Sequence, residues 1–241
     1  MEQNTKAKWR DYEQSRVDIQ ARLERLQLWD TVPLILRLAE RVWPTIQMIW
    51  PLHLENSFRD VQEALTIVQN ISSRFSDRNI QEEIINIRKH LFSVAQAIEQ
   101  AEKAKAPLAA LLAAVVYDAA LAVHLASTHT PYWYASREKG DTSHFQAIVY
   151  AIEESAKATA VHAISSFIDW IEIEHAYKVD LETLLSFRKR SKFAELNMIS
   201  YLELGPLWLL GMPEAFPDMS LLHPMLTSIP VKLPTHGGFI V

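Results

Sequence analysis

The chain has 241 residues, of which 49 % are hydrophobic and 22 % are charged, and this length is enough to bury one large core. Its formal net charge of −5 is too small to support nucleic-acid binding by bulk attraction, and the lack of cysteine excludes disulfides, thiolate catalysis and cysteine-ligated metals. The 5 glycines all lie at or after position 140. That distribution excludes the common glycine-rich phosphate loops, and with them a nucleotide-binding enzyme of the Rossmann or P-loop class.

The N-terminal segment, "MEQNTKAKWRDYEQSR", is polar and charged. It has no apolar core of the kind that a signal peptide carries, and together with the lack of cysteine this predicts a cytoplasmic protein. Residues 6–28 then carry a narrow apolar stripe with helical spacing, which predicts a first helix.

A second helix is predicted to begin within "WDTVP", residues 29–33. Asp30 or Thr31 would serve as its N-cap. Pro33 would then lie in the first turn, where a missing backbone N–H costs nothing.

The pair Trp43-Pro44 predicts a break in this second helix. A proline inside a helix removes one backbone hydrogen bond and clashes with the preceding turn, so we expect the helix to end near Val42 and to restart at Pro44. Pro51 should end the restarted piece in the same way. Trp43 would then be a core residue at a corner between helices.

Two more helices are predicted over 57–74 and 79–105 from their apolar periodicity. The first of them has Ser57 with Asp60 three residues later, which resembles a capping box.

Pro107 opens an apolar stretch of about 20 residues, which is long enough to cross a lipid bilayer. Eight of these residues are alanine, which gains little from lipid, and Asp118 at mid-span would cost about 2.5–3.5 kcal/mol on insertion. We therefore expect a central helix buried by its neighbours and no membrane contact. A carboxylate buried there needs a hydrogen-bonding partner, so Asp118 is either a structural anchor or a functional acid.

The segment "THTPYWYASREKGD", residues 128–141, is predicted to be a loop because a Thr-Pro pair opens it and glycine closes it. It holds three aromatic residues: Tyr132, Trp133 and Tyr134. Tyrosine and tryptophan are favoured anchors of protein interfaces, so these three are the predicted partner-binding residues. The alternative is that the loop folds back and covers the end of its own bundle.

Two further helices are predicted. One is a long helix from Asp141 or Thr142 to about His175. The other would be capped by Asp180 and should stop at Gly205. Repeated prolines from 213 onward prevent any further long helix.

Together these elements predict an all-α fold, a multi-helix bundle of about seven to nine helices. Residues 1–212 would form this single domain. Residues 213–241 would form an irregular proline-rich C-terminal tail that packs on the bundle or on a partner.

Two polar positions offer alternatives to a purely binding role. Glu172 and His175 have the i, i+3 spacing of one half of a helical di-metal site, but the chain has no second Glu-x-x-His. A histidine near a helix C-terminus explains His175 equally well. We therefore expect no catalytic residue, no metal and no cofactor, with a polar site around Asp118 or Glu172 and His175 as the alternative.

Several short segments resemble the YjaG-like family, a set of bacterial helical proteins of unknown function, mainly over residues 22–50. The matching segments are "LERL" at 23–26, Trp29, "AER" at 39–41 followed by Trp43-Pro44, and "YDAA" at 117–120. The resemblance implies a helical fold and a shared helix corner at Trp43-Pro44, where Glu40 and Arg41 could cap or pair. It carries over no catalytic residue.

The leading functional hypothesis is a non-enzymatic protein-binding protein, with an immunity (antitoxin-like) protein that neutralises a cognate bacterial toxin as its specific form. The expected partner is another protein or a second copy of the chain, and not nucleic acid. The one basic run, residues 188–192, is interpreted as a solvated helix face rather than as a phosphate-binding patch. The alternative is a small helical-bundle enzyme or metal-binding protein.

Overall fold

The computed structural model describes residues 22, 26, 28–74, 81–138, 170–190, 204 and 207. Within these residues the chain forms five α-helices and one short 3-10 helix and contains no β-strand, which confirms the all-α class. The elements are α2 (Leu28–Ile49), the 3-10 helix η1 (Leu52–Leu54), α3 (Glu55–Arg74), α4 (Gln81–Lys103), α5 (Pro107–Glu138) and α7 (Trp170–Arg190). The predicted helix over 6–28, the total helix count and the predicted tail lie outside the described residues.

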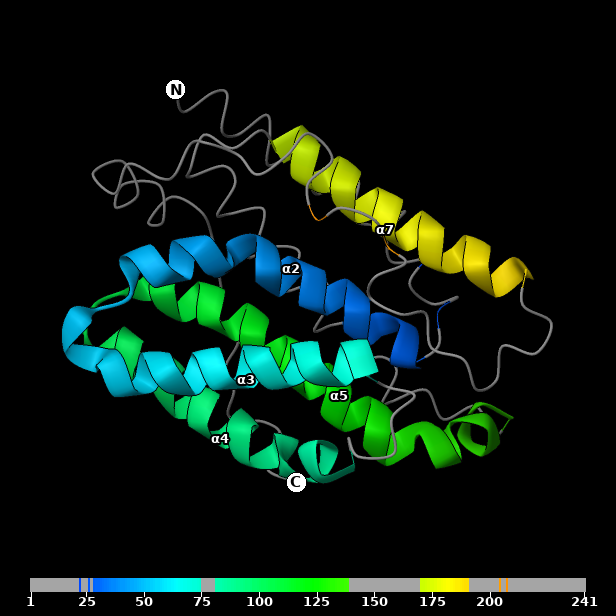
Figure 1. The fold of residues 1–241 in the computed structure, drawn as a ribbon, viewed down its shortest axis with the longest axis horizontal. Helices are drawn as coiled ribbons and strands as arrows, with labels where there is room; N and C mark the ends of the chain where they lie inside the picture. Colours follow the sequence, from blue (N-terminus) through cyan, green and yellow to red (C-terminus); the bar gives the residue numbers. More distant parts are fainter. Residues whose placement is uncertain are drawn as a thin grey trace.

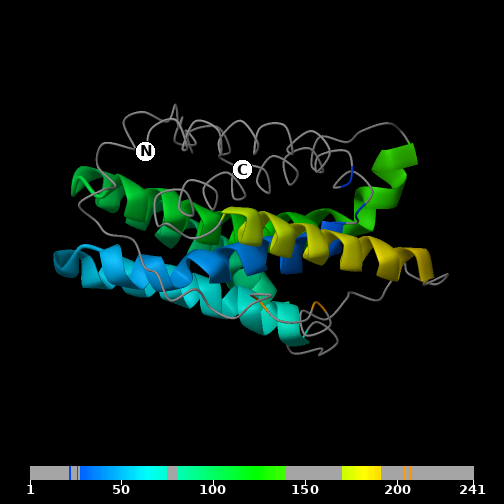
Figure 2. The same ribbon diagram turned by 90° about the horizontal axis from the view of Figure 1, so that it is seen from above.

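Helices α2, α3, α4 and α5 run alongside one another as a bundle, and α7 lies along one side of it (Figure 1). α5 contacts α2, α3 and α4, whereas α7 packs on α2. Both views show α7 alongside α2 (Figure 1 and Figure 2). α4 therefore forms an edge of the bundle away from α7.

The central position of α5 confirms the prediction of a buried helix beginning at Pro107. Between Leu108 and Ala126 most side chains are buried, and the alanines let neighbouring helices approach closely. The stretch Pro107–Ser127 is long and apolar enough to cross a membrane by length and composition, and 78 % of an 18-residue apolar segment within it is buried inside the structure. It is the one such helix among the residues that the structure describes.

Pro44 does not interrupt α2, so the predicted break after Val42 is wrong. The helix runs from Leu28 to Ile49 with Pro44 inside it. Val42 and Ile46, on either side of Pro44, are both fully buried in the core. Keeping this apolar face in the core outweighs the cost of an interior proline, which is about 3 kcal/mol.

The start of α2 also differs from the prediction. Because the helix begins at Leu28, Asp30 and Thr31 lie inside it rather than at its N-cap, and Pro33 follows the first turn. Both Asp30 and Thr31 are fully buried. An acidic side chain in the first turn still interacts favourably with the positive end of the helix dipole.

The corner between α2 and α3 is formed at Pro51, where the sequence predicts a helix end, and not at Pro44. The ring of Phe58 stacks on Trp43 with centroids 5.5 Å apart and lies 6.1 Å from the ring of Trp50. The Nε1 of Trp50 donates a hydrogen bond of 3.1 Å to the carbonyl of Leu54. The tryptophans therefore close the corner as part of the core.

The bounds of α3 and α4 agree with the two helices predicted over 57–74 and 79–105 to within two residues at each end. The predicted capping box is wrong, because Ser57 lies inside α3 and its hydroxyl donates to the carbonyl of Leu54 at 3.0 Å.

The predicted loop is wrong over 128–138, because α5 continues to Glu138. Pro131 bends the helix instead of ending it, as interior prolines commonly do. The last turns of α5 visibly turn away from the rest of the helix (Figure 2). The side chains of Tyr132, Trp133 and Tyr134 lie outside what the structure describes, so their partner-binding role stays a prediction.

α7 is continuous from Trp170 to Arg190, so the predicted separation near Asp180 is wrong. Asp180 lies in the middle of this helix and is buried, which is not the position of an N-cap. Its carboxylate is held by partners from another helix instead.

Candidate functional site

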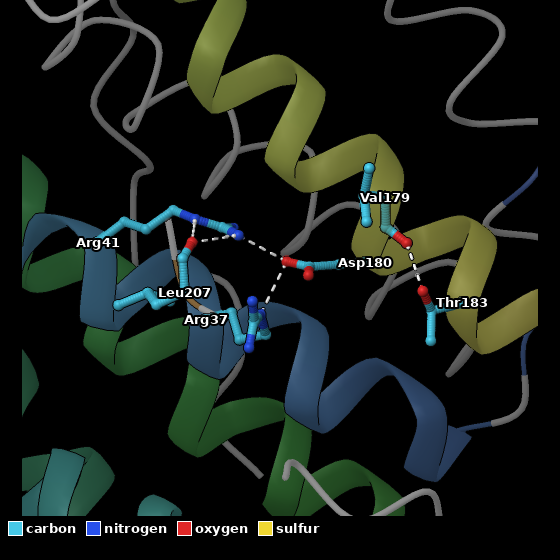
Figure 3. A network of polar contacts seen from close by, with 6 residues as sticks. All are labelled: Arg37, Arg41, Val179, Asp180, Thr183 and Leu207. Atoms are coloured by element: carbon cyan, nitrogen blue, oxygen red, sulfur yellow. Dashed lines mark hydrogen bonds and ion pairs between the residues drawn. The ribbon is translucent and has the colours of Figure 1, made fainter. Parts of the chain in front are cut away.

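A buried ion-pair network joins α2 to α7 (Figure 3). Arg37 and Arg41 lie one turn apart on α2, and both bind the Oδ2 atom of Asp180 on α7. The distances are 2.9 Å from Arg37 Nε and 2.7 Å from Arg41 Nη2. All three side chains are 0–2 % exposed, so these charges meet in the interior rather than at the surface.

Arg41 also ties a third segment to the same point. Its Nε and Nη2 atoms donate to the carbonyl of Leu207 at 3.2 Å and 3.1 Å. We call Arg37, Arg41, Asp180 and the Leu207 carbonyl the Arg–Asp network. It joins α2 to two stretches of chain, at Asp180 and at Leu207, that each lie more than a hundred residues after α2 in the sequence.

The chemistry of this network is structural. Transferring charges out of water is costly, and their mutual attraction offsets that cost only when the pairing is close and the remaining donors are satisfied. Arginine suits the task because its planar guanidinium offers several donors in a fixed geometry. The best-documented role of buried charge pairs is to favour one arrangement of the helices over others.

The residues that the resemblance places at the corner have different partners. Arg41 joins the Arg–Asp network, whereas Glu40 accepts a hydrogen bond of 2.7 Å from Gln69 Nε2 and links α2 to α3. They therefore pair, but with helices on different sides of α2 and not with each other at a turn.

Asp118 is buried on α5, as predicted from its alanine-rich surroundings. Burial raises the pKa of the neighbouring Tyr117, and the negative charge of Asp118 adds to that increase. Burial also lowers the pKa of His124, with a further contribution from the positive charge of Arg88 on α4. Both side chains are therefore favoured in their neutral forms at neutral pH.

This histidine predicts how stability depends on pH. Because the pKa of His124 is lowered in the fold, the unfolded chain takes up a proton first as pH falls below about 6.5. We expect the free energy of unfolding to fall between pH 7.5 and pH 5.5 by more in the wild type than in His124→Gln. Urea unfolding across that range checks this; two parallel pH profiles would contradict it.

The predicted metal-site residues do not come together with other ligands. The side chain of His175 is exposed on α7, and that of Glu172 lies outside what the structure describes. Across the described residues, no group of three or more histidine and acidic side chains is placed to hold a metal ion.

Large apolar side chains are exposed in two places that the sequence analysis missed. Ile85 and Phe92 on α4 are 75 % and 66 % exposed, and a spacing of seven residues puts them on one face of the helix. Met48 and Leu52, at the corner between α2 and α3, are 51 % and 97 % exposed. The signal in the sequence was the position of Ile85 and Phe92 opposite the buried stripe of α4.

No family model, curated protein or solved structure matches this chain.

Proposed function

We propose that this chain is a non-enzymatic protein-binding protein, and that its specific form is an immunity protein that neutralises a cognate toxin. The observation that carries the proposal is the exposure of four large apolar side chains in two pairs, Ile85 with Phe92 and Met48 with Leu52. Single exposed apolar residues are ordinary, but paired ones on a helix face or a corner favour a partner that removes them from water.

The burial of the polar groups supports binding rather than catalysis. A catalytic group must touch its substrate, whereas the side chains of the Arg–Asp network are 0–2 % exposed and bind one another. Asp118 is likewise buried within α5. The side chains of the Arg–Asp network therefore support the fold, whereas Ile85, Phe92, Met48 and Leu52 are apolar groups open to a partner.

The test is affinity capture of the tagged full chain from its source organism, followed by binding of the purified pair in a calorimeter. We expect one protein to be recovered and to bind at equal stoichiometry. Its affinity should fall when at least one of the two apolar pairs is replaced, as Ile85→Lys/Phe92→Lys or as Met48→Lys/Leu52→Lys. For an immunity protein, the partner expressed alone should arrest growth, and co-expression should relieve the arrest.

Thermal unfolding of each variant is the control for intact folding. Recovery of no protein beyond what an untagged strain yields would contradict the proposal.

A further inference from the structure

One exposed face of α4 combines apolar and charged side chains in an ordered way. We call Ile85, Arg88, Lys89, Phe92 and Glu99 the α4 stripe. All five are exposed, and their spacings of three, four, seven and eleven residues place them on one side of the helix. α4 lies at an edge of the bundle (Figure 1), and the exposure of these five residues places the stripe on the solvent side of the helix.

The exposed side of α4 carries charges of both signs. In the first half of the helix, Glu82 and Glu83 precede the exposed Arg88 and Lys89, and in the second half Glu99 and Glu102 are followed by Lys103. Arg88 and Glu99, which lie on opposite sides of Phe92 along the helix, are opposite charges that meet when two copies run in opposite directions.

We propose that the α4 stripe binds a second copy of this chain, with the two α4 helices antiparallel about a two-fold axis next to Phe92. The inference rests on the proposed protein-binding function and names the occupant of one of its two apolar surfaces. In such a symmetric contact, if one residue of the first copy contacts another residue of the second copy, the same pair also forms with the two copies exchanged.

The register follows from Arg88 and Glu99. They are eleven residues apart, which is three helical turns or about 16 Å along the axis, so both lie on the same flank of the stripe. An axis midway between them places Arg88 opposite Glu99 of the second copy, and Glu99 opposite Arg88 of the second copy. The two Phe92 rings then meet near the centre, shielded by the two ion pairs.

The existing ion pair of Glu99 leaves room for this contact. Lys103 Nζ lies 2.5 Å from Glu99 Oε1, and both side chains are exposed, so the pair is held weakly. A carboxylate has two oxygens and accepts from two cations at once.

The experiment is sedimentation velocity of the purified full chain over a range of concentrations. One pair of helices buries less than a standard interface, so we expect a dimer with a dissociation constant on the order of micromolar. Phe92→Lys should weaken dimerisation by about tenfold or more, whereas Leu52→Lys, at the distant corner, should leave it unchanged.

Charge reversal tests the register directly. Arg88→Glu and Glu99→Arg should each weaken the dimer by about tenfold, and the double variant R88E/E99R should restore it to within about threefold of the wild type. A dimer that tolerates Phe92→Lys, or a double variant no better than the single ones, would overturn the inference.

The failure of this inference and that of the proposed function are distinguishable. A chain that stays monomeric at every concentration, yet binds a captured protein, overturns the second copy as occupant and leaves the protein-binding function standing. A dimer with the predicted charge rescue, but with no captured protein, supports the inference and contradicts the immunity role.

Discussion

Replacing Asp180 by alanine is expected to lower the free energy of unfolding by about 3–5 kcal/mol, because it leaves Arg37 and Arg41 buried without the carboxylate that they share. The guanidinium groups are 0–1 % exposed, so water does not replace the lost partner without opening the contact between α2 and α7. Guanidinium unfolding followed by far-UV circular dichroism measures the change.

The matched control is Glu182→Ala on the same helix. Glu182 pairs with Arg22, but both side chains are much more exposed than those of the Arg–Asp network. An exposed pair of this kind contributes at most about 1 kcal/mol. If Asp180→Ala and Glu182→Ala cost the same, the interpretation of the Arg–Asp network as a buried lock is wrong.

Truncating Leu112 to alanine is the second substitution with a large expected effect, a loss of about 2–5 kcal/mol in the free energy of unfolding. Leu112 is fully buried in the first part of α5. A packed core relaxes only partly around a truncated side chain, so a cavity should remain. Urea unfolding provides the measurement.

Two control variants test whether the loss of stability comes from the cavity left by the buried Leu112 side chain. Leu112→Met keeps the volume and should cost less than about 1.5 kcal/mol. Leu52→Ala removes the same atoms from a side chain that is 97 % exposed, and should change the stability by no more than about 0.5 kcal/mol. A Leu112→Ala variant as stable as Leu52→Ala would show that α5 is not the centre of the core.

The parts of the fold that the sequence predicts are those set by local pattern. The bounds of α3 and α4 follow from apolar periodicity, and Pro107 marks the start of α5 because proline is tolerated in a first turn. The sequence predicts that α5 is buried by other helices and not by lipid, because alanine gains little from lipid and Asp118 would be costly there. These features depend on residues close together in the chain.

The errors arise where tertiary packing overrides a local preference. Proline rules predicted breaks at Pro44 and Pro131, but buried side chains on both sides of Pro44 keep α2 whole, and α5 bends and continues. Asp180 was interpreted as an N-cap because aspartate favours that position. Its actual partners lie 139 and 143 residues away, a distance over which a single sequence gives no pairing signal.

One clue to the Arg–Asp network was present in the sequence. Arg37 and Arg41 stand four residues apart in "LILRLAERV", a segment that is apolar except for these arginines and Glu40, and two like charges at that spacing repel unless an anion lies between them. The clue indicates that an acid is needed, but many acids in the chain could supply it. Ile85 and Phe92 also had a signal in the sequence, because they lie opposite the apolar stripe of α4 that packs in the core.

The sequence separation within the Arg–Asp network has a consequence for the order of folding. Contacts between consecutive helices, α2 with α3, α3 with α4 and α4 with α5, close short loops, whereas Asp180 must return across 139 residues to reach Arg41. Closing a longer loop costs more chain entropy, and contacts of high separation slow the search for the native state. The four-helix part can therefore assemble first, with α7 docking onto a preformed pair of arginines as a late step.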